Sequence, residues 1–166
     1  SLKKKLVKII NKLNNNKYFV ILRPHPRDIN KNFYQNLKKK NKKNKLFLFD
    51  DSNNYLKTYN DSSLMITDLS GTAYTYAFLT KKPVIFFSIR ENFVLKSDYK
   101  YLNYFIDRRL LGEIITNEKK IVFVVKKCLK RKNKIKKEIL KLIKKNQLEI
   151  NSFKLTTNLL KKISND

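Results

Sequence analysis

The stretch Phe19-Val20-Ile21-Leu22-Arg23-Pro24-His25-Pro26 decides the predicted fold, because an apolar run stops abruptly at the only histidine of the chain. A short β-branched and aromatic run without polar residues is typical of a strand that is buried on both faces of a parallel sheet. Pro24 and Pro26 forbid further ladder pairing and fix the direction of the chain. We therefore expect His25 at the carboxyl end of a buried strand, which is where open α/β sheets bind their ligands.

A second segment of this kind runs from Leu64 to Thr72, where another apolar run, predicted to be a buried strand, leads into a small polar turn and then a helix. Residues 88–109 show no clean period and are predicted to form a long, partly helical loop. Hydrophobic periodicity predicts strands over 18–22, 46–49, 64–67, 84–87 and 114–115, and helices over 2–13, 29–40, 53–59, 71–80, 118–130, 134–145 and 148–163.

The alternation of these strands and helices predicts an α/β fold, a Rossmann-like parallel sheet with helices on both faces. We expect a single domain over 1–166, with its core over about 17–131 and a helical tail over about 134–164. The chain starts with Ser1 and a Lys-rich amphipathic segment that lacks the features of a signal peptide, so we interpret it as the later part of a longer protein. Its apolar runs are shorter than the roughly 18 residues that a transmembrane helix needs.

The net charge of +26 first suggests a nucleic-acid partner, but the kinds of basic residue argue against it. Only six of the 39 basic residues are arginine, the residue that base readout and bidentate phosphate contacts favour. Lysine is spread over every predicted helix, and Asn and Ile are abundant too, which an A/T-rich genome explains. We therefore favour a solvated lysine surface. If the basic surface has a partner, anionic membrane lipids are the predicted one.

The single cysteine and the single histidine disfavour a zinc site. Cys128 falls on an apolar position of a predicted helix, where core packing is the favoured role. We expect neither a metal ion nor a cofactor.

Ser70-Gly71-Thr72 has the form of a phosphate site at the start of a helix. Gly71 would let a ligand approach the backbone, free N–H groups of the first turn would point at it, and Ser70 and Thr72 would add hydroxyl donors. The alternative is plain N-capping by Ser70. The segment is neither a Walker loop nor a dinucleotide fingerprint, because the required Lys and glycines are missing.

His25 is the candidate catalytic residue, because the flanking Pro24 and Pro26 hold its ring at the sheet edge. Near a phosphate it would neutralise the charge on a leaving group or donate a proton, which is worth about 10²–10⁴ in rate. The alternative is a local hydrogen bond. Arg23 and Arg27 flank it and could clamp phosphate oxygens, although a solvated role is an equal alternative for Arg27.

Four more polar residues lie at predicted strand ends. Asp68 either orients a hydroxyl or holds the turn, and we favour the structural role because a carboxylate repels phosphate. Asp50, Asp51 and Ser52 would either bind a ribose or base or cap a helix, and we favour the cap.

Taken together, three segments resemble the C-terminal half of the CDP-glycerol glycerophosphotransferase family, whose enzymes build teichoic acids and related surface polymers. They are Ile21-Leu22-Arg23-Pro24-His25-Pro26, the run Met65 to Tyr74, and Lys82-Pro83-Val84-Ile85-Phe86-Phe87. The same pairing of motifs is similar to that of capsule-polysaccharide transferases and of bacterial sialyltransferases that use CMP-activated sugars. The resemblance covers roughly residues 18–129 and implies the C-terminal, donor-binding domain of a GT-B fold, whose N-terminal domain this chain lacks.

The resemblance implies that His25 lies at the donor phosphates and that Ser70, Gly71 and Thr72 form the phosphate cradle. Leu69 stands where the family usually has Tyr, and Gly71-Thr72 alters its serine pair, which leaves a sugar donor open. The implied reaction is metal-independent transfer from a CDP- or CMP-activated donor to a surface-polymer acceptor. The implied place is the cytoplasm, with peripheral contact at the inner face of the plasma membrane.

Three other functions stay open at this point. A basic nucleic-acid-binding module would show steeply salt-dependent binding. A sugar-nucleotide-binding protein that kept the GT-B-like fold but lost its chemistry is disfavoured by the intact His25 and Ser70. A GT-B-like epimerase fits the two motifs less well than the transferases do.

Overall fold

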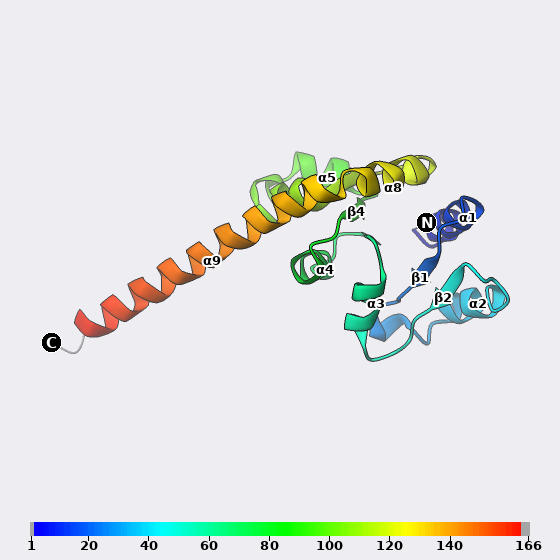
Figure 1. Cartoon of the computed structure of the whole chain (residues 1–166), viewed down its shortest axis with the longest axis horizontal. Helices are drawn as coiled ribbons and strands as arrows, with labels where there is room; N and C mark the ends of the chain where they lie inside the picture. The colour runs from blue at the N-terminus through cyan, green and yellow to red at the C-terminus, as the bar shows by residue number, and fades with distance from the viewer. Residues whose placement is uncertain (1, 164–166) are drawn as a thin grey trace.

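The computed structural model describes residues 2–163 of the chain and the side chains up to residue 147. It is a mixed α/β structure in which short strands alternate with helices, as the sequence predicts (Figure 1). The strands are β1 (Val20–Leu22), β2 (Phe47–Phe49), β3 (Met65–Thr67), β4 (Val84–Phe87) and β5 (Gly112–Ile115). The α-helices are α1 (Leu2–Asn15), α2 (Asn32–Lys40), α3 (Tyr55–Asp61), α4 (Thr72–Thr80), α5 (Glu91–Lys96), α6 (Asn103–Ile106), α7 (Arg108–Leu111), α8 (Ile121–Lys130) and α9 (Lys132–Ile163), and the 3-10 helices are η1 (Pro26–Asp28), η2 (Asp98–Tyr101) and η3 (Glu118–Lys120).

All strand pairs are parallel, but backbone hydrogen bonds divide the five strands into two small sheets. β1 pairs with β2, and β4 lies between β3 and β5. The single sheet that the sequence predicts is thus not continuous between β1 and β3 in the described residues. The strands are only three or four residues long and offer few groups for a ladder, and no backbone pairing joins β1 or β2 to the three-stranded sheet.

The strands differ in burial. β4 is buried along its whole length, with Val84, Ile85 and Phe86 at 0% exposure, because it is the central strand of its sheet. β1 is only partly buried and Phe19 just before it is 56% exposed, so the prediction of a strand buried on both faces is wrong there. β1 has a partner on one side only, which leaves its other edge less covered. β3 is partly buried too, not fully as predicted.

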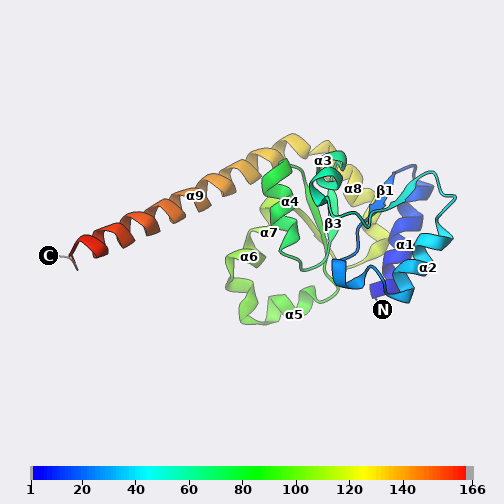
Figure 2. The ribbon, with the colours of Figure 1, turned by 90° about the horizontal axis from the view of Figure 1, so that it is seen from below.

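The core forms around β4 and draws on both ends of the described chain. Ile9 and Leu13 of α1 pack into it together with Val124 and Cys128 of α8. Residues of the first turns of α9 also belong to this core, namely Ile135, Ile139 and Leu142. The predicted core position of Cys128 is confirmed, and burial raises the pKa of its thiol to about 11. Figure 2 shows α9 continuing outward from this body as one helix in place of the two predicted ones. No helix within residues 2–163 is long and apolar enough to cross a membrane.

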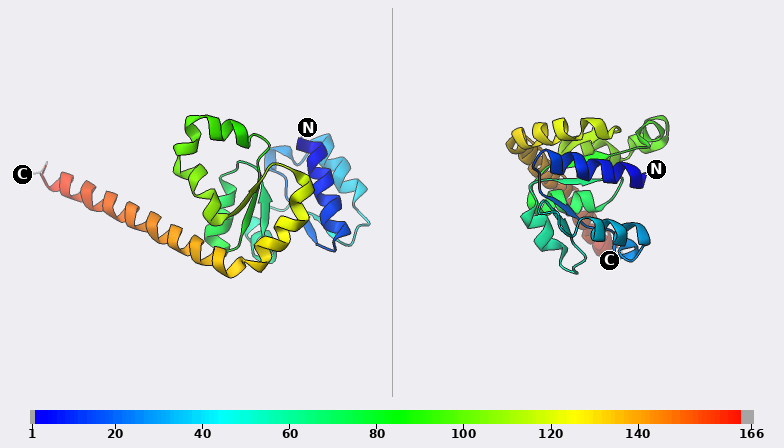
Figure 3. Two further views of the ribbon diagram at one scale, coloured as in Figure 1. Left: turned by 90° about the horizontal axis from the view of Figure 1, so that it is seen from above. Right: turned by 90° about the vertical axis from the view of Figure 1, so that its right-hand side faces the viewer.

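The segment 88–109, predicted as a long, partly helical loop, is partly helical as predicted and contains more helix than expected. It forms α5, η2, α6 and α7, which together make an arc beside the sheet before the chain enters β5 (Figures 2 and 3). We call this segment the arc.

A buried ion pair closes the arc. The Arg108 guanidinium, 1% exposed, donates two hydrogen bonds to the Glu91 carboxylate, at 3.1 and 3.0 Å. It also lies 4.9 Å from the ring centre of Phe105 and 5.6 Å from that of Phe86. Periodicity carries no signal for such a pair, since its partners are 17 residues apart in different helices.

Of the two glycines, Gly112 is the one that the fold requires. A Cβ on Gly112 would lie 1.9 Å from the carbonyl oxygen of Val84, so only glycine lets β5 approach β4 so closely. Gly71 has helical backbone angles that any residue adopts, and a Cβ there would meet nothing within 4 Å.

Removing one partner of the buried ion pair should destabilise the protein strongly. We expect Arg108→Leu to lower the free energy of unfolding by about 3–5 kcal/mol, because it leaves the Glu91 carboxylate buried without its cation. Urea denaturation of Arg108→Leu measures this effect, with the exposed neighbour variant Arg109→Leu as the control. The double variant Glu91→Leu/Arg108→Leu should recover much of the loss, and a single-variant effect no larger than that of Arg109→Leu would contradict the assignment.

Candidate functional site

Polar side chains gather where the parallel strands end. Parallel strands of one sheet present their carboxyl ends at the same edge. Arg23 and His25 follow β1 and Asp50 follows β2 in one sheet, and the turn Asp68–Gly71 follows β3 in the other sheet. These are the strand ends at which the sequence places a ligand.

His25 is exposed and its ring is held by one local hydrogen bond. The backbone N–H of Arg27 donates to His25 Nδ1 at 3.2 Å, in the tight turn where Pro26 begins η1. Because Nδ1 accepts, the neutral ring carries its proton on Nε2. His25 thus makes the local hydrogen bond that the sequence analysis gave as the alternative to catalysis. This bond uses Nδ1 and leaves Nε2 available as a donor. Pro24 is buried and anchors the turn.

The turn before α4 combines a hydroxyl pair with a free backbone donor. Ser70 Oγ and Thr72 Oγ1 lie 2.8 Å apart, and the Thr72 N–H reaches Ser70 Oγ at 3.4 Å. The Ser70 carbonyl accepts from the Ala73 N–H at 3.1 Å, but the N-cap of α4 is Gly71 and no side chain caps this helix, so the alternative of N-capping by Ser70 is wrong. Gly71 N–H makes no hydrogen bond within the described part of the chain, and the space at the Gly71 Cα is open. The turn thus keeps an accessible backbone donor.

The phenol of Tyr34 in α2 is affected by charges from two other segments. Burial raises the pKa of its phenol, and the charges of Asp28 and Asp68 raise it further, whereas Lys31 lowers it. Asp28 follows His25 in η1, and Asp68 follows β3, so charges from both segments act on the Tyr34 phenol.

Asp68 is itself exposed, and its carboxylate forms no hydrogen bond or ion pair with the described residues. Its predicted role in holding the turn gains no support from these contacts. Asp68 also raises the pKa of Tyr104 in α6, after the larger effect of burial. The charge of Asp68 thus acts on both Tyr34 and Tyr104, and sequence reasoning missed both because each lies in a segment of ordinary helical or irregular sequence.

Arg23, a predicted phosphate ligand, is engaged within the chain. Its guanidinium donates to Asp50 Oδ2 at 2.6 Å and to the Ser52 carbonyl at 2.8 Å. Thr58 also donates to the Asp50 carboxylate, which is 8% exposed, and the Ser52 N–H donates to it at 3.0 Å. Burial alone would raise the pKa of Asp50, but the hydrogen bonds from Thr58, Ser52 and Arg23 outweigh it and lower the pKa to about 2. Arg23 therefore joins the ends of β1 and β2.

The helix caps differ from those predicted. Asn54, not Asp50, Asp51 or Ser52, caps α3, because its side chain accepts from the Lys57 N–H at 3.2 Å. Asp51 pairs with Lys38 instead. Asp28 of η1 forms an ion pair with Lys31, ahead of α2, which begins at Asn32.

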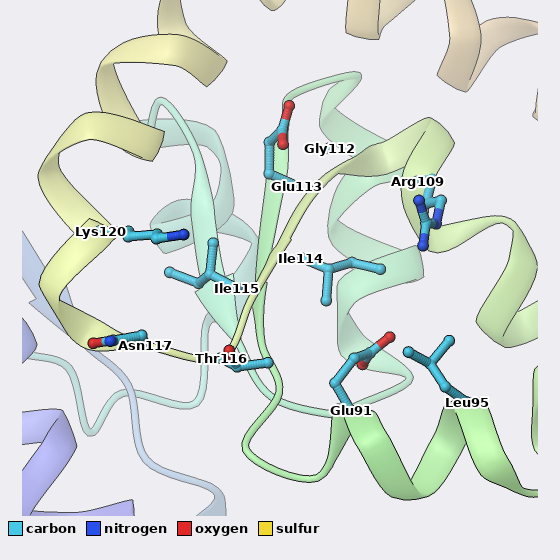
Figure 4. A pocket seen from close by; sticks show the side chains of 10 residues that line it. All are labelled: Glu91, Leu95, Arg109, Gly112, Glu113, Ile114, Ile115, Thr116, Asn117 and Lys120. Carbon is cyan, nitrogen blue, oxygen red and sulfur yellow. The ribbon is translucent and has the colours of Figure 1, made fainter.

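A pocket of about 410 Å³ lies elsewhere, along the outer side of β5 (Figure 4). Arg109, Ile114 and Lys120 line it, and none of the predicted site residues does. We place the candidate site at the His25 edge on chemical grounds, because the pocket lacks the paired hydroxyls and the histidine. Among residues 2–147, no group of three His, Cys, Asp or Glu side chains could hold a metal ion.

Asp50 should contribute a pH-dependent stability. Its pKa is about 2 in the folded state against 3.8 as the ordinary value, so the contribution is present above about pH 4 and is lost as the pH falls toward 2. We expect Asp50→Asn to lower the free energy of unfolding at pH 7 by about 2 kcal/mol and to flatten its decline between pH 4 and pH 2. Asp51→Asn, at an exposed ion pair, is the matched control for thermal unfolding across pH and should change little. Equal effects of the two variants would contradict the role of Asp50.

The comparisons with known proteins agree with the sequence motifs. The family model described as CDP-Glycerol:Poly(glycerophosphate) glycerophosphotransferase matches residues 2–163. The chain is 26% identical over 128 residues to the minor teichoic acid biosynthesis protein GgaB of Bacillus subtilis (strain 168), an alignment that covers 75% of this chain and 13% of that protein. No solved structure matches the chain. Because the family model covers nearly the whole sequence, the predicted family is confirmed: this chain belongs to the CDP-glycerol:poly(glycerophosphate) glycerophosphotransferase family.

Proposed function

We propose that this chain is the donor-binding domain of a GT-B transferase that adds glycerol phosphate or a sugar to a cell-surface polymer such as a teichoic acid or capsule polysaccharide. The main support is that an exposed His25 with a free Nε2 donor and the open Ser70–Thr72 turn each follow the carboxyl end of a parallel strand. The family and the relative named for teichoic acid biosynthesis support the class of reaction. Because the chain spans 13% of that relative, the activity of a whole protein is part of this proposal.

The donor would be a CDP- or CMP-activated compound whose phosphates lie at this edge. Gly71 N–H would donate to a phosphate oxygen, and the hydroxyls of Ser70 and Thr72 would add further donors. The start of α4 also provides a favourable field for an anion, worth about 0.3–1 kcal/mol. Lysines on the surrounding surface would attract the donor from a distance.

The transfer step follows from these contacts. With CDP-glycerol, an acceptor hydroxyl oxygen would attack the phosphorus that bears glycerol, a new P–O bond would form, and the bond to the bridging oxygen would break. CMP would leave with the bonding electron pair, and the hydroxyl proton would pass to a base or to solvent. With a CMP-sugar the same attack would occur at the anomeric carbon. His25 Nε2–H would stabilise the charge that develops on the departing phosphate.

Arg23 would act on this site indirectly. Its ion pair with Asp50 fixes the end of β1 next to the Pro24–Pro26 turn, and so it would position His25. We therefore assign Arg23 no direct contact with phosphate, because its N–H groups already donate to the Asp50 carboxylate and the Ser52 carbonyl.

His25 can be tested with two variants that separate its two nitrogens. The side-chain oxygen of Asn can replace Nδ1 in the turn but leaves no donor at the position of Nε2, whereas the longer Gln can place its NH₂ there. We expect His25→Asn to weaken binding of CMP or CDP about 10–100-fold and His25→Gln to retain part of the affinity. Thermal shift and calorimetric titration with CMP, CDP and UDP measure this, starting from dissociation constants of roughly 10 µM to 1 mM. Equal binding by wild type and both variants would overturn the proposed role.

Gly71 offers a second test that leaves the fold intact. Gly71→Ala adds a methyl group where the protein leaves open space and where the backbone angles suit alanine. We therefore expect unchanged or slightly raised thermal stability but weaker nucleotide binding, because the methyl group stands beside the N–H that would contact phosphate. Thr75→Ala, one turn further along α4 on an exposed position, is the control. Full nucleotide affinity in Gly71→Ala would exclude close approach of the donor to this backbone.

A further inference from the structure

β5 is an edge strand, and its outer edge pairs with no strand of the described residues. The Ile115 carbonyl accepts from the Ser88 N–H at 2.8 Å, so the backbone groups of Ile115 face β4. In a strand the two backbone groups of one residue point to the same side, and that side alternates from residue to residue. The N–H and C=O of Ile114 therefore face the open edge, which is a template for pairing with another chain.

A groove follows this open edge (Figure 4). The pocket of about 410 Å³ is lined by the consecutive residues 112–116, with side chains of the arc on one side and of the segment 117–120 on the other. Five residues of a strand span roughly 16 Å. The hollow thus runs along the strand and has the length of a short extended peptide. We call it the β5 groove.

One wall of the β5 groove is apolar. The half-exposed Leu95 of α5 and the partly buried Ile114 lie on the same side of the strand, toward the arc (Figure 4). Successive side chains of an extended peptide point to opposite faces. Every second side chain of a peptide in the groove would therefore meet this wall.

Two cations of the β5 groove have no partner. Arg109 of α7 and Lys120 of η3 are both exposed, and neither forms a hydrogen bond or an ion pair with the described residues. The two carboxylates of the lining, Glu91 and Glu113, are already ion-paired with basic side chains outside the lining. Figure 4 shows Arg109 and Lys120 on opposite sides of β5. The unpaired charge of the groove is thus positive on both sides of the strand.

We propose that the β5 groove binds an extended acidic peptide segment of another protein, which adds to the three-stranded sheet as a further strand. The main chain of the peptide would pair with the N–H and C=O of Ile114. Carboxylates on its two faces would meet Arg109 and Lys120. In strand addition of this kind, main-chain hydrogen bonds provide the affinity and alternate side chains provide the specificity.

The charge of this sequence argues against a second copy of the chain as the occupant. The sequence has 13 acidic residues against 39 basic ones. Asp50 and Asp51 are its only acidic residues that lie closer together than five positions, and both are engaged in ion pairs. No other short segment of this sequence therefore brings two carboxylates, and the acidic strand has to come from a different protein.

The β5 groove is separate from the proposed donor site, because neither His25 nor any residue of the Ser70–Thr72 turn lines it. The inference therefore goes beyond the proposed function and does not depend on it. CDP binding is measured alongside peptide binding in every experiment below. A failure of one proposal leaves the other intact.

The main-chain contact can be tested with a blocked heptapeptide of the sequence Thr-Glu-Val-Val-Glu-Val-Thr, whose two glutamates lie on opposite faces of a strand. Titration followed by NMR should shift the amide signals of residues 112–116 but not that of Gly71, with a dissociation constant of roughly 10 µM to 1 mM. Two further peptides carry N-methyl groups at the even or at the odd positions. One of them should bind at least about tenfold more weakly than the other, because only one edge of the peptide faces β5. Equal binding of both methylated peptides, or no shifts at residues 112–116, would overturn the proposal.

The two cations can be tested by charge reversal. We expect Arg109→Glu and Lys120→Glu each to weaken binding of the heptapeptide about tenfold, because each opposes one of its carboxylates. Lys119→Glu is the matched control, since it changes the net charge equally at an exposed neighbour outside the lining, and it should bind the peptide like wild type. CDP binding should be the same in all three variants. An equal loss of peptide affinity in Lys119→Glu would reduce the effect to net charge and contradict a defined groove.

Discussion

Complete burial of β4 is the constraint on which the rest of the structure depends. A strand with Val84, Ile85 and Phe86 fully covered needs partners on both edges and helices on both faces. β3 and β5 supply the edges, and α1, α4, α8 and the start of α9 supply side chains of the same core. Segments that are far apart in the sequence are therefore drawn together around four residues.

This arrangement also determines where chemistry is possible. Because the strands run parallel, the polar turns after β1 and β3 are placed at strand ends, where first-turn N–H groups and short side chains remain accessible. The partly buried Arg23–Asp50 pair joins β1 to β2, and the buried Arg108–Glu91 pair holds the arc beyond β4. Two ion pairs thus fix the segments that follow β1 and β4.

Some charged side chains make specific buried or half-buried hydrogen bonds, and others are simply exposed on the surface. Arg23 and Arg108 are both buried or half-buried and hydrogen-bonded to carboxylates, in keeping with the planar guanidinium that makes bidentate contacts. Most lysines of the helices are exposed and serve solubility and long-range attraction. Lys82 is an exception, since its Nζ donates to the carbonyls of Asn60 and Ser62, at 2.6 and 2.7 Å, and so binds the end of α3.

The sequence by itself determined the order of strands and helices, the family, and the placement of His25 and Ser70–Thr72 at strand ends, because apolar periodicity and the positions of Pro and Gly are local signals. It did not determine that β1 is half-exposed, that Arg23 forms an ion pair with Asp50, or that Asn54 caps α3. These features depend on which groups meet in space. The requirement for Gly112 and the pairing of Glu91 with Arg108 likewise follow from contacts between segments distant in sequence. Only the tertiary structure decides that the charges of Asp28 and Asp68 both raise the pKa of Tyr34, because this effect depends on distance through space and not on separation along the chain.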